Sequence, residues 1–115
     1  MRTLAAVFAG GCAGALVRAG LVEAFPVAPG TWPWVTLAVN LAGAFILGYV
    51  ATRAQAWLPL VGSGFCGALT TFSTLQVELL RMFDADRYGL AASYLGVSIV
   101  LGYGAIVLAT RLGRR

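Results

Sequence analysis

Apolar residues fill four long stretches of the chain, and short segments that carry most of the charged residues separate them. A helix needs about 20 predominantly apolar residues to cross the hydrocarbon core of a bilayer. Each stretch meets this requirement, so the pattern predicts an all-α membrane protein with four transmembrane helices. The predicted spans are Leu4–Val22, Trp34–Thr52, Leu58–Leu80 and Gly89–Thr110.

The connecting segments have the composition of turns at a membrane surface. Phe25–Pro33 is rich in proline and glycine, and the adjacent Trp32 and Trp34 are placed to form an interfacial aromatic belt. Arg81–Tyr88 is the most charged connector. The first stretch also has the length of a signal peptide, but three more spans follow it, so we expect it to be retained. We expect residues 1–115 to form a single four-span domain.

Composition supports a membrane protein and excludes other classes. Hydrophobic residues make up 60% of the chain and charged residues 10%, whereas soluble domains carry about 25% charged residues. The chain has no histidine, and no carboxylate pair or nucleophile stands beside a base, so we do not expect an enzyme. The arginines flank apolar runs, a pattern typical of membrane interfaces and not of nucleic-acid binding.

The arginines also predict an orientation. One group of arginines falls on the side of both termini: Arg2, Arg53, Arg111, Arg114 and Arg115. Arg81, Arg87 and the acidic residues fall on the other side. The positive-inside rule therefore places both termini in the cytoplasm of a multi-pass protein of the plasma (inner) membrane.

Small residues recur at helical spacing. Gly10 and Gly14 form a GxxxG motif, and Ala38 and Ala42 repeat the spacing in the second span; such faces allow helices to approach closely. The segment VGSGFCG (Val61–Gly67) holds three further glycines. They allow either tight packing or an unwound turn, because glycine lowers the cost of leaving the helix.

Polar residues gather in the third span, within GALTTFSTLQVE (Gly67–Glu78). Thr70, Thr74 and Glu78 are spaced at i, i+4 and i+8, so on a helix they form one stripe. Hydroxyl groups in membrane helices usually bond to the carbonyl one turn earlier. A stripe that also contains a glutamate exceeds this role, which indicates a face that contacts water or an ion.

Three other polar positions lie at membrane depth. Asn40 either pairs with a hydroxyl on another helix or presents its amide to an anion path. Tyr94 and Ser98 lie one turn apart and have the spacing for hydrogen bonds between helices. Arg18 either extends to the headgroups or raises the anion concentration at a vestibule.

Three segments, GGCAGALVR (Gly10–Arg18), GTWPWVTLAVNLAGAFILG (Gly30–Gly48) and GFCGALTTFSTLQVE (Gly64–Glu78), occur in this order in a four-span chain. The set closely resembles the Fluc (CrcB) family of fluoride channels. The resemblance implies a passive, fluoride-selective channel that exports fluoride from the cytoplasm. It further implies an antiparallel, dual-topology dimer with two pores along its interface and a third span broken near the midplane.

The resemblance also implies site residues by matching position. The implied fluoride pore comprises Arg18, Asn40, Phe72, Ser73, Thr74, Glu78, Tyr94 and Ser98. Asn40 would supply an amide, Phe72 a positive ring edge, and Arg18 a vestibule charge. The backbone carbonyls of Gly67 and Thr70 would hold a central structural Na⁺. The chain departs from the family at Leu75, where a second phenylalanine is usual, which puts a paired-aromatic site in doubt.

The implied partners are fluoride, the lipid bilayer and a second copy of the chain, with a homologous second chain as the alternative. Two rival functions remain. A small multidrug-resistance exporter would need a carboxylate deep in the first span, whereas the first acidic residue, Glu23, lies at its end. A non-transporting accessory membrane protein would leave the polar stripe of the third span unexplained.

Overall fold

The structure is a computed structural model that describes residues 2–26, 28, 31–70 and 72–115; the side chains of Phe72 and Ser73 are also outside the described part. All regular structure within these residues is helical. In chain order the elements are α1 (Arg2–Ala24), α2 (Trp34–Arg53), the 3₁₀ turn η1 (Gln55–Trp57), the π-helix η2 (Leu58–Cys66), α3 (Gly67–Leu69), α4 (Phe72–Asp84) and α5 (Tyr88–Gly113).

Four helical segments are long and apolar enough to cross a membrane: Arg2–Ala24, Trp34–Arg53, Gln55–Asp84 and Tyr88–Gly113. The prediction of an all-α membrane protein with four such helices is confirmed. The helices extend a few residues past the predicted apolar spans, because the last turns of a helix continue into the polar interface. The longest dimension of the molecule is 47 Å, whereas the hydrocarbon core is about 30 Å thick. The helices are therefore long enough to reach the polar interface.

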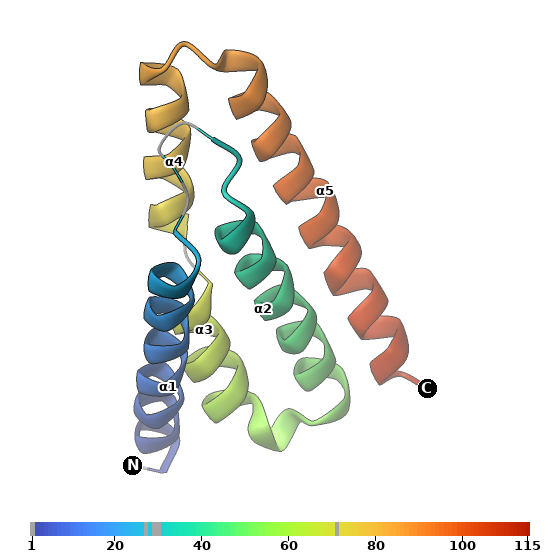
Figure 1. Ribbon diagram of the computed structural model, residues 1–115. Helices are drawn as coiled ribbons and strands as arrows, with labels where there is room; N and C mark the ends of the chain where they lie inside the picture. The colour runs from blue at the N-terminus through green and yellow to red at the C-terminus, as the bar shows by residue number, and fades with distance from the viewer. Residues whose placement is uncertain (1, 27, 29–30, 71) are drawn as a thin grey trace.

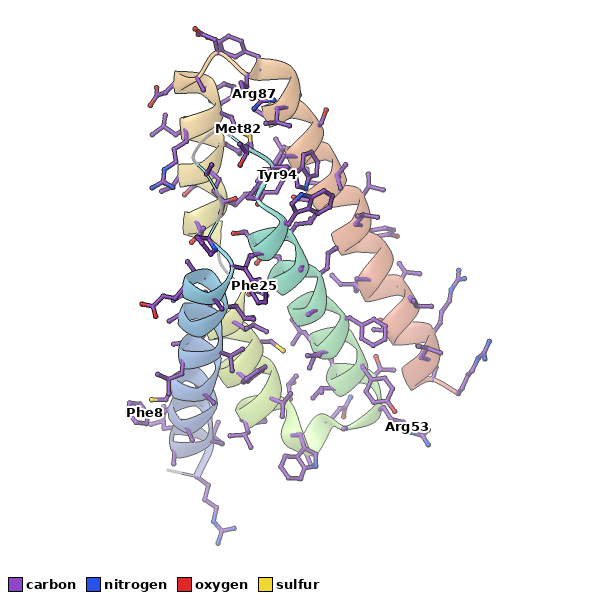
Figure 2. The ribbon with its side chains drawn as sticks, viewed as in Figure 1. Phe8, Phe25, Arg53, Met82, Arg87 and Tyr94 are labelled. Atoms are coloured by element: carbon purple, nitrogen blue, oxygen red, sulfur yellow. The ribbon has the colours of Figure 1, made fainter. Side chains whose placement is uncertain are left out.

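The helices alternate in direction, and both termini lie at one end of the molecule (Figure 1). α1 packs along η2 and α3, α2 lies between this pair and α5, and α4 packs against α5 (Figure 1). Arg53 lies at the end that holds the termini, and Arg87 lies at the opposite end (Figure 2). The predicted orientation depends on this separation of the arginines. The orientation in a membrane stays a prediction.

The closest helix contact joins α1 to η2, and glycine makes it possible. A Cβ atom at Gly10 would overlap the carbonyl oxygen of Leu60, and one at Gly14 would overlap the carbonyl oxygen of Phe65. A Cβ atom at Gly64 would lie 2.8 Å from the carbonyl oxygen of Val7. The predicted packing role of Gly10 and Gly14 is confirmed, because the two backbones meet with no space for a side chain.

The second small-residue pattern, in α2, is exposed instead of packed. Ala38 and Ala42 are exposed, so this face of α2 is uncovered in the single chain. α2 instead buries the face that carries Thr36, Leu37 and Gly43. Large apolar side chains are exposed around the molecule as well, and Phe8 points away from α1 (Figure 2). Such a surface suits lipid or a second membrane protein.

The backbone of the third segment is irregular where its sequence is rich in glycine and threonine. α3 ends at Leu69, and Thr70 follows in an extended conformation with φ −77° and ψ 153°. The amide and the side-chain hydroxyl of Thr70 both donate to the carbonyl oxygen of Cys66, at 3.0 and 2.9 Å. α4 begins at Phe72. The hydroxyl of Thr70 thus bonds to the backbone one turn earlier, as expected for a threonine in a membrane segment.

We predict that Gly10→Ala destabilises the protein by about 1–3 kcal/mol, because the added methyl group would overlap a backbone carbonyl of η2 that cannot rotate away. The thermal unfolding midpoint in detergent measures the effect. Gly20→Ala is the matched control on the same helix, since no heavy atom lies within 4 Å of its added methyl group. Equal unfolding midpoints for the two variants would contradict the α1–η2 contact.

Candidate functional site

Two contacts align α2 with the polar stripe of the third segment. Near the start of α2, the Thr36 hydroxyl donates to Oε1 of Glu78 at 2.5 Å. Two turns further along α2, Gly43 lies against the side chain of Thr70, and a Cβ atom there would overlap the Thr70 methyl group. The two contacts join α2 to Thr70, which follows α3, and to Glu78 in α4; α4 itself lies mostly beyond the start of α2 (Figure 1).

Asn40 and Thr74 lie between these two contacts along the sequence. Asn40 lies between Thr36 and Gly43 on α2, and Thr74 lies midway between Thr70 and Glu78. Residues three or four apart share a face of a helix, so Asn40 belongs to the α2 face that carries the two contacts. Both side chains are half-buried, and neither is unpartnered. The two ends of the predicted stripe, Thr70 and Glu78, therefore contact α2, but Thr70 is extended and precedes α4, so the stripe is not one continuous helical face.

A group of buried polar side chains, here called the polar cluster, lies where α2 begins beside α4 and α5. Its members are Trp32, Thr36, Glu78, Tyr94 and Ser98. Thr36 bonds to Glu78, and Tyr94 lies close enough to interact with the same carboxylate. The Tyr94 ring meets Trp32 edge-on, with centroids 5.5 Å apart and planes at 73°. Ser98 follows Tyr94 by one turn of α5.

Four atoms of the polar cluster are buried and have no hydrogen-bond partner among the described residues. They are Nε1 of Trp32, Oε2 of Glu78, the Tyr94 hydroxyl and the Ser98 hydroxyl. Tyr94 is fully buried, at 0% exposure. A buried polar atom without a partner costs about 1–3 kcal/mol, so such atoms mark places where water or an ion binds.

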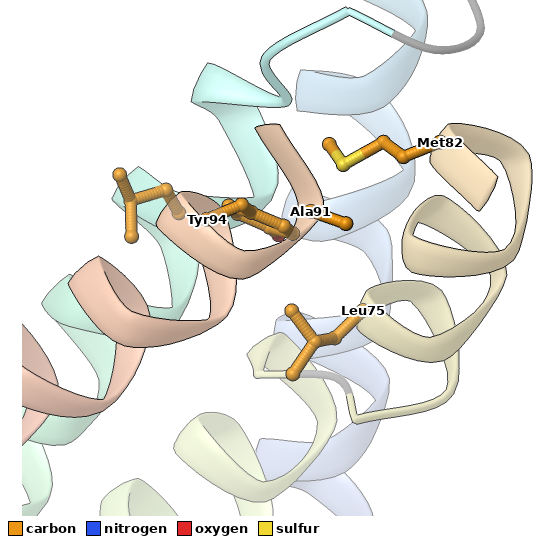
Figure 3. Packing of buried hydrophobic residues seen from close by; sticks show 5 residues of the cluster. Leu75, Met82, Ala91 and Tyr94 are labelled. Carbon is orange, nitrogen blue, oxygen red and sulfur yellow. The ribbon is translucent and has the colours of Figure 1, made fainter. Parts of the chain in front are cut away.

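Apolar residues enclose the polar cluster on the side of α4 and α5. Leu75 and Met82 of α4 point toward Ala91 and Tyr94 of α5 (Figure 3). Leu75 is 8% exposed and belongs to this core. The leucine that stands where the resembling family usually has a second phenylalanine is therefore a packing residue between α4 and α5 in this chain.

The remaining predicted site residues lie elsewhere or outside the described part. Arg18 is half-buried and follows Gly14 by one turn of α1, on the face that packs against η2 and α3. It belongs to that helix pair and not to the polar cluster. Phe72 begins α4, but its side chain and that of Ser73 lie outside the described residues.

Gly67 and Thr70 were predicted to hold a cation with their carbonyl groups. Gly67 begins α3, and Thr70 is the extended residue that follows it. The carbonyl groups in the last turn of a helix lack amide donors within the helix, and backbone oxygens are ligands that hard cations accept. Within the described residues, no three His, Cys, Asp or Glu side chains lie together as metal ligands. A cation at this place would depend on backbone oxygens.

Sequence reasoning missed two members of the polar cluster. Thr36 precedes Asn40 by one helical turn, and that spacing was the available signal for a shared face. Trp32 was assigned to an interfacial belt together with Trp34. Trp34 fits this role, at 68% exposure, whereas the indole nitrogen of Trp32 is buried. No sequence pattern separates the two tryptophans, because the difference arises from the contact with Tyr94.

Most polar groups of this region are hydrogen-bond donors. Indole, hydroxyl and amide groups donate hydrogen bonds, and the single carboxylate accepts one from Thr36. While that bond holds, the Thr36 hydroxyl is not available as a donor to an ion. The Trp32 indole and the hydroxyls of Tyr94 and Ser98 are buried donors without a hydrogen-bond partner among the described residues. Such a set suits an anion or water.

Comparison with known proteins identifies the family of this chain. Residues 5–110 match the family model described as CrcB-like protein, Camphor Resistance (CrcB). The chain is 51% identical to the fluoride-specific ion channel FluC 1 of Mycolicibacterium paratuberculosis, over 99% of this chain and 92% of the relative. It is 38% identical to the fluoride-specific ion channel FluC 2 of Symbiobacterium thermophilum, over 97% of this chain and 98% of the relative. The chain therefore belongs to the CrcB family, a family of ion channels and not of enzymes.

Proposed function

We propose that this protein is a passive, fluoride-selective channel that exports fluoride from the cytoplasm across the plasma (inner) membrane. The observation that carries the proposal is the pair of contacts between α2 and the polar third segment, Thr36–Glu78 and Gly43–Thr70. In this proposal, the amide and hydroxyl groups between the two contacts line the fluoride path. The relatives' names, fluoride-specific ion channels, supply the identity of the ion.

The chemistry of fluoride matches these donors. Fluoride is small and strongly hydrated, so a protein must replace its water with hydrogen-bond donors at close range. We assign this role to the amide of Asn40 and to the hydroxyls of Ser73, Thr74, Tyr94 and Ser98, with the ring edge of Phe72 as a further positive contact. Glu78 accepts the Thr36 hydroxyl and orients the donors around it.

We place Arg18 at the entry to this path. A guanidinium group is charged at every physiological pH, and a charge at a vestibule concentrates anions. Arg18 continues the α1 face that contacts η2 and α3, so it approaches the polar stripe from the α1 side. In this proposal it attracts fluoride and does not bind it inside the path.

We further propose that the functional unit is an antiparallel, dual-topology dimer with two pores along its interface. A single chain leaves faces of small residues uncovered: Ala38 and Ala42 are exposed, and nothing lies within 4 Å of a Cβ atom at Gly96, Gly102 or Gly104. In membranes such faces permit close contact with another helix. The second chain is a copy of this one or, as the alternative, a homologous chain.

A central Na⁺ is part of the proposed dimer. α3 ends at Leu69 and Thr70 is extended, which supports a break in the third transmembrane helix at this point. The carbonyl groups of Gly67 and Thr70 fit a hard cation in chemical type, but one chain supplies too few oxygens for a complete site. Two copies would supply twice as many. The bound cation would offset the polar backbone exposed at both breaks.

The proposed function is tested by ion efflux from liposomes that contain the purified chain alone. We expect rapid fluoride efflux, measured with a fluoride electrode once valinomycin carries the compensating potassium, and much slower chloride efflux under the same conditions. Absence of efflux from folded protein, or equal rates for both ions, would contradict a selective homodimeric channel. Efflux that requires a second, homologous chain would identify a heterodimer.

Asn40→Asp should lower fluoride efflux by at least about tenfold, because it replaces two N–H donors with a negative charge in the proposed path. Gln55→Glu is the matched control, since Gln55 is exposed in η1 and its change also converts an amide to a carboxylate. We expect the control to conduct within twofold of the native protein. Unchanged efflux in a folded Asn40→Asp protein would remove Asn40 from the path.

Replacement of Na⁺ on both sides of the membrane by N-methyl-D-glucamine tests the proposed cation. If carbonyl oxygens of the two copies share one Na⁺, its removal should lower fluoride efflux and the thermal unfolding midpoint together, because the dimer loses a bound ligand. Chloride salts of the two cations at equal ionic strength provide the control for the unfolding midpoint. Identical behaviour with either cation would contradict the proposed Na⁺ site.

A further inference from the structure

The indole nitrogen of Trp32 is a buried donor that the proposed fluoride path does not use. Trp32 immediately precedes Pro33 and α2, and its ring packs against the apolar core that includes Tyr94. Its Nε1 atom is buried without a hydrogen-bond partner among the described residues. Trp34, two residues later, is 68% exposed. The two tryptophans of this turn therefore have different environments, and Trp32 alone belongs to the polar cluster.

The chemistry of an indole limits which groups can form a hydrogen bond with Trp32. Its N–H group donates one hydrogen bond, accepts none and does not ionise at physiological pH. The neighbouring hydroxyls of Tyr94 and Ser98 also have no partner within the described residues. The Trp32 indole is thus a buried donor without a partner among the described residues, whereas the Tyr94 hydroxyl lies beside the Glu78 carboxylate. A small acceptor that enters beside the indole would satisfy its N–H group.

We propose that the Trp32 N–H group donates a hydrogen bond to fluoride at the polar cluster, which makes Trp32 a fluoride-binding residue beside Tyr94 and Ser98. This inference rests on the proposed function and adds a donor to the same path. The edge-on contact between the Trp32 and Tyr94 rings, with centroids 5.5 Å apart, holds the indole next to the Tyr94 side chain.

The indole also reduces the electrostatic repulsion between the polar cluster and fluoride. Glu78 places a carboxylate beside Tyr94, and a carboxylate repels an anion. Its Oε1 atom already accepts the Thr36 hydroxyl, whereas Oε2 has no partner within the described residues. An N–H donor that cannot lose its proton provides positive partial charge near this carboxylate at every physiological pH. Trp32 therefore offsets part of the repulsion that fluoride meets at this point.

The first test is Trp32→Phe, which keeps an aromatic ring against Tyr94 and removes the N–H group. We expect fluoride efflux from liposomes to fall about tenfold, the size expected for loss of one hydrogen bond to a charged group. Trp34→Phe is the matched control, with efflux within twofold of the native protein. Native efflux rates in a folded Trp32→Phe protein would overturn the proposal.

The second test observes the N–H group directly in the native protein. In a ¹⁵N–¹H spectrum recorded in detergent, the chain has three indole signals, one for each tryptophan. With sodium fluoride, the Trp32 proton signal should move downfield, whereas those of the exposed Trp34 and Trp57 should not. Sodium chloride at equal ionic strength should leave Trp32 unmoved. Assignment uses Trp34→Phe and Trp57→Phe, so it does not depend on the folding of Trp32→Phe.

The outcomes separate this inference from the proposed function. An immobile Trp32 signal, or an equal shift with chloride, would indicate a bound water or a general salt effect and would overturn the proposal. Reduced efflux in Trp32→Phe without a fluoride-dependent signal would make Trp32 a positioning residue for Tyr94, which also overturns it. Failure of the native chain to release fluoride would contradict the proposed function itself, independently of any Trp32 variant.

Discussion

A polar side chain inside a bilayer must find its partner within the protein, because lipid offers none. The pair of contacts between α2 and the polar third segment meets this constraint. At one end Thr36 donates to Glu78, and at the other Gly43 leaves room for Thr70. Asn40 lies on the same face of α2, between these two contacts. The proposed fluoride path runs between the two contacts.

The rest of the fold holds the third segment on both sides of Thr70. The glycine contact of α1 with η2 holds the third segment up to Leu69, where the helical backbone ends and Thr70 becomes extended. The core between α4 and α5 holds the other end and encloses Tyr94 completely. In the proposed function, the donors left without partners among the described residues of the polar cluster are the cost of a site prepared for an ion. Uncovered small-residue faces on α2 and α5 are where the proposed second chain would complete the assembly.

Hydropathy and helical spacing predicted much of this arrangement. Stretches of apolar residues predicted four membrane helices, and the spacing of Thr70, Thr74 and Glu78 predicted a polar stripe on the third. The close contact at Gly10 and Gly14 was predicted because small residues four apart favour it. The partner of the stripe was not predictable, because it depends on the register between α2 and α4. The same holds for the π-helical backbone of η2, the core position of Leu75 and the buried nitrogen of Trp32, which are all set by contacts between helices.

The central proposal is that Asn40 and Thr74 act on the same fluoride ion. A double-mutant cycle on fluoride efflux, with Asn40→Ser, Thr74→Val and the combined variant, tests it most directly. Residues that act on the same ion should show non-additive losses, so the combined variant should conduct little worse than the poorer single variant. Losses that simply multiply would show that the two side chains act independently and would contradict the proposed path.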